Sequence, residues 1–427
     1  MRLMKSPFLF PTLSMLAVSL MAQQAPEPPL EFPALTLPQA RAEALNSNPE
    51  LKAAEAGWRA SQGGTRQART LLNPGLEVSR DDFGGSLPMD QRAPQEALAL
   101  TQTVRLSGKR QAEIAAADSA SAAAVERYRQ VRLDVLTGVE RQFAELLGAQ
   151  ERERIATENL DTAQEMARVV QALVEAGEAS PIEAVRAQNE QDLAAIDYQG
   201  ALQDLATAKS TLARTLGMSS VHFERAEGTL AEEVAVPDEE AVLLTLQRLP
   251  DLARLSAETR RLEASLQRAR REAIPDPTFS VGMKRYTTTQ EKAYFAGVAI
   301  PIPLFNRNRG GIIEASARLD QGQLEMRAEE IRLRALVATT RSSLRRSADE
   351  VASLRERVLP KAEQVYSAVN EGYLRGKFRL LDLLEARRSL ASLRLRFVDA
   401  VVRLNLAKAD MDRLSVNDPT LTEGATP

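Results

Sequence analysis

The chain has 427 residues, with 55 lysines and arginines against 58 aspartates and glutamates, which gives a net charge of −3. This near balance excludes a global electrostatic attraction to nucleic acid, and the lack of cysteine excludes disulfides, thiolate metal sites and a lipid-bearing N-terminal cysteine. Charged residues make up 26% and aromatic residues only 4%, which favours long helices packed through narrow seams over an aromatic-rich globular core.

Residues 1–22 have the pattern of an export signal peptide. Arg2 and Lys5 precede a mostly apolar stretch from Phe8 to Ala22, in which small residues suit cleavage. A retained anchor is the alternative, because two prolines interrupt the stretch. Residues 23–37 are expected to form an N-terminal extended segment. No later run of about 18 apolar residues predicts a transmembrane helix.

Two segments roughly 200 residues apart open in the same way, which predicts an internal two-fold structural repeat. Residues 44–51 read Ala-Leu-Asn-Ser-Asn-Pro-Glu-Leu, and residues 245–252 read Thr-Leu-Gln-Arg-Leu-Pro-Asp-Leu. Each proline suits a helix start, since its missing N–H would be unpaired there anyway. We expect the first repeat at 38–216, a linker at 217–238, the second repeat at 239–416 and a flexible tail at 417–427.

Each repeat then breaks at a proline and continues as a predicted β-hairpin. The breaks are Asn73-Pro74-Gly75 in the first repeat and Pro275-Asp276-Pro277 in the second. Apolar and polar residues alternate on both sides of a polar loop after each break. This pattern predicts hairpins at about 74–105 and about 277–303.

A long helical stretch follows each hairpin. The first runs from about residue 111 to 176 and the second from about 312 to 375, and at 1.5 Å per residue each reaches on the order of 100 Å. Apolar residues recur by threes and fours, as in Leu136, Val139 and Phe143, which predicts a coiled-coil seam. Pro360 interrupts the second stretch and predicts a kink or a local break.

Both long helices are expected to end at a glycine turn, after which a second helix returns. The turns are Glu175-Ala176-Gly177-Glu178 and Leu374-Arg375-Gly376-Lys377. The sequence thus predicts coiled-coil hairpins at 108–216 and 308–416. The helix before each β-hairpin and the returning helix together nearly match the long helix in length. One long helix can therefore pack along two shorter ones stacked end to end.

Two β-hairpins supply four strands, which are too few to close a barrel. An open sheet edge in lipid has unpaired backbone groups, and each such group costs several kcal/mol. Closure therefore needs other copies of the chain, because membrane barrels have at least about eight strands. A dimer would supply eight strands and a trimer twelve, and the residues alone leave both open. They also leave open that the hairpins are soluble layers on a periplasmic coiled-coil scaffold.

The chain resembles the TolC-type outer membrane factors, the outer membrane efflux protein family, over about residues 35–416. The duplicated plan, the prolines before the hairpins and the glycine-turned coiled coils carry this resemblance. Its most specific part is the segment 373–386, Tyr-Leu-Arg-Gly-Lys-Phe-Arg-Leu-Leu-Asp-Leu-Leu-Glu-Ala. The run Pro-Ile-Pro-Leu-Phe-Asn-Arg-Asn-Arg-Gly at 301–310 is most similar to the CzcC-like heavy-metal branch.

The resemblance implies a mainly α chain with a small β part. It implies a homotrimeric outer-membrane β-barrel, with four strands per chain, continuous with a periplasmic α-helical coiled-coil barrel. The function that it implies is a passive exit duct in the cell outer membrane, part of a tripartite efflux pump. An inner-membrane transporter of the heavy-metal RND type and a periplasmic adaptor (membrane fusion protein) would be its partners. A type I protein-secretion duct is the alternative within this class.

The resemblance also assigns a periplasmic gate. By position it consists of a tyrosine and three acids: Tyr373, Asp382, Glu385 and Glu183. Asp382 and Glu385 are three residues apart and so share one helix face. Three-fold symmetry would make each a ring of three carboxylates, which raises their pKa values and attracts cations. The family's gate arginine falls on Phe378, with Arg379 one residue later, so the arginine–acid latch is expected to be altered.

The two glycine turns gain a further role from the resemblance. Ala176, Gly177, Arg375 and Gly376 would form the tips that contact the adaptor, where small residues permit close backbone approach. No catalytic residue, cofactor or bound metal is expected, and the chain is not expected to be an enzyme. One histidine, His222, and no cysteine exclude His-based zinc motifs and cysteine nucleophiles.

Overall fold

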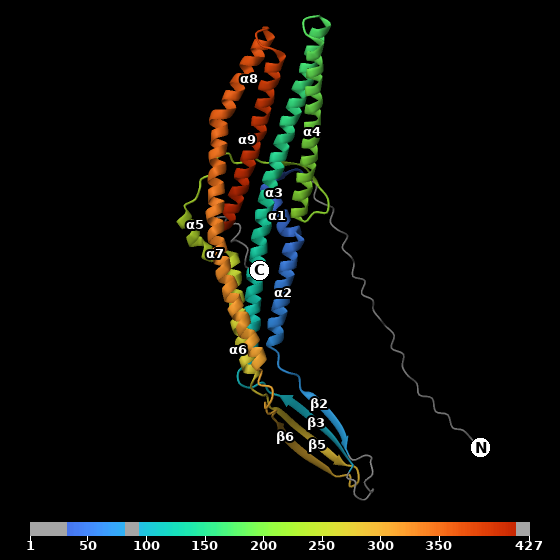
Figure 1. Cartoon of the computed structure of the whole chain (residues 1–427). Helices are drawn as coiled ribbons and strands as arrows, with labels where there is room; N and C mark the ends of the chain where they lie inside the picture. Colours follow the sequence, from blue (N-terminus) through green and yellow to red (C-terminus); the bar gives the residue numbers. More distant parts are fainter. Residues whose placement is uncertain (1–31, 82–93, 416–427) are drawn as a thin grey trace, which may run out of the picture.

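The computed structural model describes residues 32–81 and 94–415. The expected signal peptide, most of the expected N-terminal extended segment, the loop of the first β-hairpin and the expected C-terminal tail lie outside these residues. Within them the chain forms a long body of helices with a small sheet at one end (Figure 1). None of the helices in this part of the chain is both long and apolar enough to cross a membrane.

The first half of the chain runs from a short strand to a long helical hairpin. Its elements are β1 (Phe32–Thr36), α1 (Leu37–Ser47), α2 (Pro49–Ala68), β2 (Gly75–Asp81), β3 (Gln95–Thr103), α3 (Lys109–Glu175) and α4 (Pro181–Leu216). Asn48 separates α1 from α2, and its side chain accepts hydrogen bonds from the N–H groups of Glu50 and Leu51. Its amide also donates to the Thr215 carbonyl at 2.9 Å, which fixes the end of α4 against the start of α2.

The second half has its helices and hairpin strands in a similar order. Its elements are β4 (Phe223–Glu227), α5 (Glu239–Thr245), η2 (Leu246–Arg248), α6 (Pro250–Glu272), β5 (Thr278–Tyr286), β6 (Lys292–Ala299), α7 (Arg309–Ser353), η3 (Leu354–Val358), α8 (Leu359–Leu374) and α9 (Leu380–Ser415). Pro49 and Pro250 both occupy the first turn of their helices, where a proline removes no hydrogen bond.

Long helices pack along pairs of shorter ones. The 67-residue α3 contacts the 20-residue α2 and the 36-residue α4, which follow each other along its length (Figure 1). In the second half α6 and α9 lie in the same way along α7, η3 and α8. Contacts of α3 with α6 and α9 join the two halves. In the described chain, almost every helix therefore packs against another helix along its apolar side.

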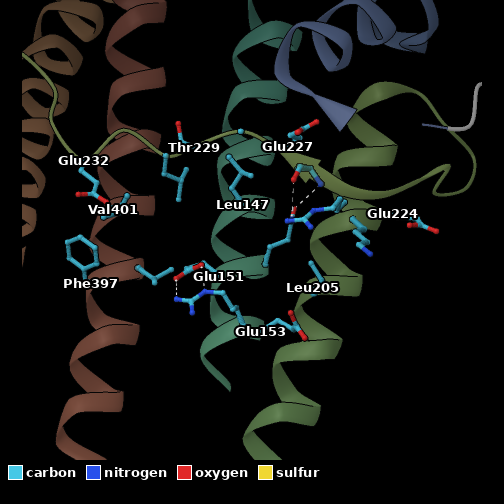
Figure 2. Close-up of a pocket in the computed structure, with 18 residues that line it drawn as sticks. Leu147, Glu151, Glu153, Leu205, Glu224, Glu227, Thr229, Glu232, Phe397 and Val401 are labelled. Carbon is cyan, nitrogen blue, oxygen red and sulfur yellow. Dashed lines mark hydrogen bonds and ion pairs between the residues drawn. The ribbon is translucent and has the colours of Figure 1, made fainter. Parts of the chain in front are cut away.

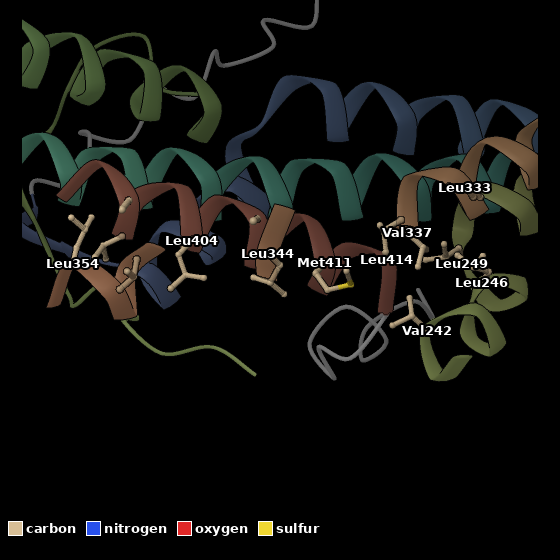
Figure 3. Close-up of a cluster of buried hydrophobic side chains, with 14 residues drawn as sticks. Val242, Leu246, Leu249, Leu333, Val337, Leu344, Leu354, Leu404, Met411 and Leu414 are labelled. Carbon is tan, nitrogen blue, oxygen red and sulfur yellow. The ribbon is translucent and has the colours of Figure 1, made fainter. Parts of the chain in front are cut away.

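The largest apolar core lies where α7 and α9 cross the short helices α5 and η2 (Figure 3). Leu333, Leu344, Leu404 and Leu414 are at most 1% exposed there. Full burial of one leucine side chain contributes about 1.5–3 kcal/mol, so this cluster holds α5 and η2 onto the long helices. A second core joins α1, α3, α4, β1 and β4.

The irregularity expected at Pro360 is present, and it takes the form of a π turn. The long helix is split into α7 and α8 by the five-residue segment η3, which ends two residues before Pro360. A proline inside an α-helix lacks an N–H and clashes with the carbonyl four residues earlier. A wider turn relieves that clash, and such turns occur mostly as single insertions in α-helices. Leu354 at its start stays buried in the core.

The segment expected to be a linker contains a strand that no local sequence pattern predicted. β4 lies inside residues 217–238 and pairs in parallel with β1, from Phe32↔Phe223 to Thr36↔Glu227. The side-chain amide of Gln150 on α3 bonds both the N–H and the carbonyl of Ala226. α1 begins at Leu37, so the end of the expected extended segment is a strand followed by a helix start.

Candidate functional site

The first helical hairpin turns at the end of the molecule farthest from the sheet (Figure 1). Gly177 has a φ of +77°, a value that favours glycine because it has no Cβ. Its N–H donates to the Val174 carbonyl at 3.0 Å, and the N–H of Glu178 donates to the Leu173 carbonyl at 2.8 Å. These two bonds are those of a Schellman motif, which satisfies the last carbonyls of α3. Ala176 and Gly177 are exposed at this tip.

The second hairpin turns with the same geometry at the same end of the molecule (Figure 1). Gly376 has a φ of +69°, and its N–H donates to the Tyr373 carbonyl at 2.9 Å. The N–H of Lys377 donates to the Gly372 carbonyl at 2.7 Å, which completes the motif. Arg375 and Gly376 are exposed. Two equivalent turns thus form the two tips.

Phe378, where the resemblance led us to expect a gate arginine in other members, packs onto the second turn. Its ring occupies the space that a Cβ on Gly372 would need. Gly372 is buried and the ring of Phe378 is 45% exposed. The residue at this position therefore contributes an apolar contact to the turn and no charge.

An apolar cluster close to the tips joins the two hairpins. We call it the tip cluster, and its members come from α3, α4, α8 and α9: Met166, Ala167, Val170, Ala184, Ala187, Tyr373, Leu380 and Leu384. Tyr373 is partly buried against it, and this burial, together with the nearby Glu183 carboxylate, raises the pKa of the phenol. The structure thus brings two of the expected gate residues, Tyr373 and Glu183, to the same place.

The other two expected gate residues lie at the start of α9. The Asp382 carboxylate accepts the backbone N–H of Arg379 at 2.9 Å and lies 3.7 Å from the Arg379 guanidinium. This contact satisfies one free N–H of the first turn of α9. Glu385 lies one turn on and is exposed. Among the described residues, no hydrogen bond or ion pair joins either acid to Tyr373 or Glu183. The ion pair between Arg379 and Asp382 is local to the start of α9 and connects α9 to no other element.

Two arginines that were not among the expected site residues connect the hairpins close to the tip cluster. Arg388 on α9 forms a two-pronged ion pair with Glu190 on α4, with Nε at 2.9 Å from Oε2. The Glu190 side chain is only 11% exposed. The neighbouring Arg387 donates to the Asn159 carbonyl on α3, and burial lowers its pKa. The partners Arg388 and Glu190 are 198 residues apart in the sequence, and no spacing signal connects them.

The four-stranded sheet has strand order β2-β3-β5-β6, all antiparallel, and its register gives it two different faces. Side chains alternate along each strand, so residues aligned across the strands share one face. The first face, which we call the apolar face, is hydrophobic except for Gln102 at its helical end and one charged row beside the hairpin loops. Its hydrophobic members lie between the hairpin loops and the helical body: Leu76, Val78, Leu98, Leu100, Phe279, Val281, Met283, Tyr294, Ala296 and Val298.

The opposite face, which we call the small-residue face, carries small and polar side chains. Its members include Glu77, Ser79, Ala97, Ala99, Thr101, Ser280, Gly282, Lys284, Phe295 and Gly297. The ring of Phe295 lies over Gly282 and 5.5 Å from the Lys284 ammonium. The apolar residues of the first face are largely exposed, for example Val78 at 74% and Tyr294 at 83%. Such a surface suits an apolar environment on one side and a polar one on the other.

A cavity of about 790 Å³ lies at the middle of the helical body, where the segment 224–232 crosses α3, α4 and α9 (Figure 2). Several acids line it, among them Glu153, Glu224 and Glu232. Glu151 is bonded to Arg154 at 2.5 Å. Among the residues that the structure describes, no group of three or more histidines, aspartates or glutamates is arranged to hold a metal ion. The arrangement is that of a groove with mixed apolar and charged walls under a crossing segment.

Comparison with known proteins identifies a family over nearly the whole described chain. The profile of the outer membrane efflux protein family matches residues 40–218 and 242–414. The chain is 33% identical over 382 residues to the cobalt-zinc-cadmium resistance protein CzcC of Cupriavidus metallidurans, covering 89% of this chain and 90% of that protein.

Solved structures show the same fold at low sequence identity. A membrane protein from Pseudomonas aeruginosa is 20% identical with a TM-score of 0.77, covering 89% of this chain and 90% of that one. The outer membrane protein VceC from Vibrio cholerae is also 20% identical, with a TM-score of 0.75 and coverage of 89% and 96%. The mainly helical architecture with a four-stranded sheet at one end is therefore a fold that these membrane proteins share.

Proposed function

The chain belongs to the outer membrane efflux protein family and is an outer-membrane efflux channel, and from this premise we propose that it is the passive exit duct of a tripartite metal-export pump. A periplasmic adaptor and an inner-membrane transporter of the RND type would deliver the cargo. The duct would transform no substrate and would hold no cofactor.

The observation that carries this proposal is the sheet at the end of the helical body. Its apolar face is exposed, and its outer strands β2 and β6 each have one edge that pairs with no other strand among the described residues. Unpaired strand edges are unfavourable in lipid, because each unpaired backbone group there costs several kcal/mol. Pairing of β6 with β2 of the next copy would remove both edges.

We propose three copies, which would make a twelve-stranded barrel that continues into a helical tunnel. The two halves of the chain, at 38–216 and 239–416, would act as an internal two-fold structural repeat, so that three chains supply six similar units around the wall. The apolar face would contact lipid and the small-residue face would line the pore. Small side chains such as Ala97, Ala99 and Gly297 support this orientation, because they leave the interior open.

We assign the gate to the tip region, where the two hairpins meet. Tyr373 and Glu183 would hold the hairpins together, and Asp382 and Glu385 would form acidic rings around the three-fold axis. Such rings attract cations to a pore. The exposed tips, Ala176-Gly177 and Arg375-Gly376, would contact the adaptor. Gly177 and Gly376 support this role, since a residue without a side chain permits close approach of another backbone.

The proposed cargo is a divalent transition-metal ion. The relative CzcC is named for resistance to cobalt, zinc and cadmium, and further relatives at 28% and 30% identity are named for nickel and cobalt resistance. A duct needs no metal ligands of its own, because the transporter selects the ion.

The test is complementation in a bacterial host that lacks its own duct. The full chain, co-expressed with its cognate adaptor and transporter, is expected to restore growth on cobalt, zinc or cadmium. The chain without those two partners should not restore growth, and it should run as a heat-modifiable oligomer extracted from outer membranes. The proposal would be contradicted if the chain, adaptor and transporter together did not improve growth on these metals. It would also be contradicted if the chain were found as a soluble monomer in the periplasm.

The gate assignment is tested in planar bilayers. The double variant Asp382→Ala/Glu385→Ala is expected to raise conductance and weaken block by divalent cations, because the carboxylate rings are removed. Glu371→Ala, an exposed acid on α8 outside the assigned rings, is the control. Conductance and block equal to those of the control would show that these acids form no ring.

A further inference from the structure

One cross-strand row on the apolar face of the sheet is strongly cationic. The register aligns Arg80 with Glu96, Glu96 with Arg285, and Arg285 with Lys292, so these four residues lie side by side across the whole sheet. The row follows directly after Val78, Leu98, Met283 and Tyr294, on the side of the hairpin loops. We call it the rim row.

The rim row has a charge imbalance that the described protein does not correct. Glu96 lies 3.7 Å from the Arg80 guanidinium and forms its ion pair there. Arg285 donates to the neutral Gln290 side chain, and no described carboxylate forms an ion pair with Arg285 or Lys292. Like charges directly opposite in a sheet are destabilising. An anion between these two cations would remove that penalty.

Neighbouring acids do not supply the missing charge, because they alternate onto the other face. Asp81 aligns with Gln95, and the Glu291 carbonyl accepts the N–H of Tyr286, which also aligns with Gln95, so both acids lie on the side of the small-residue face. Within the described part of the sheet, Glu96 is the one acid on the apolar face. The row thus presents three cations and one anion on the side that would face lipid.

The position of the row points to a membrane surface. Tyr294, 83% exposed, lies one row below Lys292 on the same face. Tyrosine is enriched where the hydrocarbon of a bilayer meets its headgroups. The apolar face is continuous from Tyr294 toward the helical body, so the rim row lies just beyond its hydrophobic part, at headgroup level.

We propose that the rim row, and the Arg285–Lys292 pair above all, binds the phosphate groups of lipopolysaccharide in the outer leaflet of the outer membrane. This inference rests on the proposed function, since it needs the sheet to be embedded with its hairpin loops outward. Guanidinium and ammonium groups form charge-assisted hydrogen bonds with phosphate oxygens. The Arg80–Glu96 pair beside them limits the binding surface on one side.

The test measures the Kd of fluorescent lipopolysaccharide for the full-length protein in an uncharged detergent. Each cation at an anionic lipid surface is worth about 1 kcal/mol, or roughly fivefold, so Arg285→Gln/Lys292→Gln is expected to raise Kd by roughly 25-fold. Glu96→Gln should lower Kd, because it removes the only acid of the row. Lys284→Gln, next to Arg285 but on the opposite face, is the matched control and should leave Kd unchanged.

Further arms identify the source of the phosphate. Dephosphorylated lipopolysaccharide should bind the wild type as weakly as intact lipopolysaccharide binds the double variant. Full displacement by millimolar inorganic phosphate, or an equal effect of the double substitution on phosphatidylglycerol binding, would overturn the assignment to lipopolysaccharide. A Kd for the double variant equal to that of Lys284→Gln would overturn the site itself.

Conductance of the same preparations in planar bilayers separates this inference from the proposed function. If the wild type forms channels and the double variant binds lipopolysaccharide normally, only the rim-row assignment fails. If the wild type forms no oligomer and no channel, the proposed function fails, and the lipid site that depends on it fails too.

Discussion

Single glycines set the direction of the chain at the two tips. Gly376 occupies a left-handed backbone conformation, which costs an L-residue with a Cβ about 1–2 kcal/mol. We expect Gly376→Ala to lower the free energy of unfolding by about that amount and to weaken metal export. Thermal unfolding of the purified protein and growth on metal measure the two effects.

The control for this prediction is the same substitution in a helix. Gly64 lies inside α2 with nothing near the space of an added Cβ. Gly64→Ala should therefore stabilise the protein by roughly 0.5–1 kcal/mol, because alanine is the better helix former. If Gly376→Ala and Gly64→Ala shift the unfolding temperature equally, backbone strain is not the reason for glycine at the tip.

Tyr373 gives the tip cluster a predicted dependence on pH. Burial and the Glu183 carboxylate both raise its pKa above the ordinary value of about 10. The folded chain therefore keeps the phenol proton at a pH where the unfolded chain releases it. The stability that this provides is complete below pH about 10 and is lost as pH rises through the raised pKa.

Comparison of the wild type with Tyr373→Phe tests this dependence. The difference in unfolding free energy between them should change as pH rises above about 10, since phenylalanine cannot ionise. Glu183→Gln should make the wild-type dependence smaller, because it removes the nearby negative charge. A difference that stays constant with pH would show that Tyr373 titrates normally.

Between elements, the Arg388–Glu190 pair joins α9 of one hairpin to α4 of the other. The Arg388 side chain is 62% exposed, so solvent screens the ion pair. The contribution of the pair to holding the hairpins together is therefore limited to about 1 kcal/mol, roughly fivefold in an equilibrium constant. Arg388→Gln is expected to increase the population with separated hairpin tips by that factor. Distances between spin labels on the exposed residues Ala176 and Arg375 report the separation.

Two variants make the hairpin experiment specific. Arg394→Gln removes an ion pair with Glu363 that lies within the second hairpin, so it should leave the tip distance unchanged. The charge exchange Glu190→Arg/Arg388→Glu should restore the wild-type distance if attraction between the two side chains is the cause. Separation in the Arg394→Gln variant as large as in Arg388→Gln would contradict a specific role of the pair.

The helices and turns could be predicted from the sequence because their signals are local. Asn48-Pro49 marks a helix start and Gly376 a helix end within a few residues, and the backbone there has the expected caps. β4 was missed, because its partner β1 lies almost two hundred residues away and supplies the pairing. For the same reason the contact between Arg388 and Glu190 was not predicted. Phe378 on Gly372 was also not expected, since the resemblance provided an arginine there.

At the scale of the whole molecule, the two faces of the sheet decide whether the chain can enter a membrane. Val281 lies in the middle of the apolar face, aligned with Leu100 on β3 and Ala296 on β6. A lysine near the middle of a bilayer on the lipid side of a barrel costs roughly 2–4 kcal/mol. An assembly of three chains would carry this cost three times. Val281→Lys is therefore expected to abolish the heat-modifiable oligomer in outer membranes.

Ser280→Lys is the matched control, because Ser280 precedes Val281 and lies on the small-residue face. A lysine there would enter the water-filled interior, so the oligomer should form and its conductance and ion selectivity should change. Electrophoresis of unheated and heated outer membranes measures assembly, and planar bilayers measure the pore. Equal loss of the oligomer in both variants would contradict the assignment of the faces. Assembly of Val281→Lys with altered selectivity would reverse it, and the rim row would then face the pore.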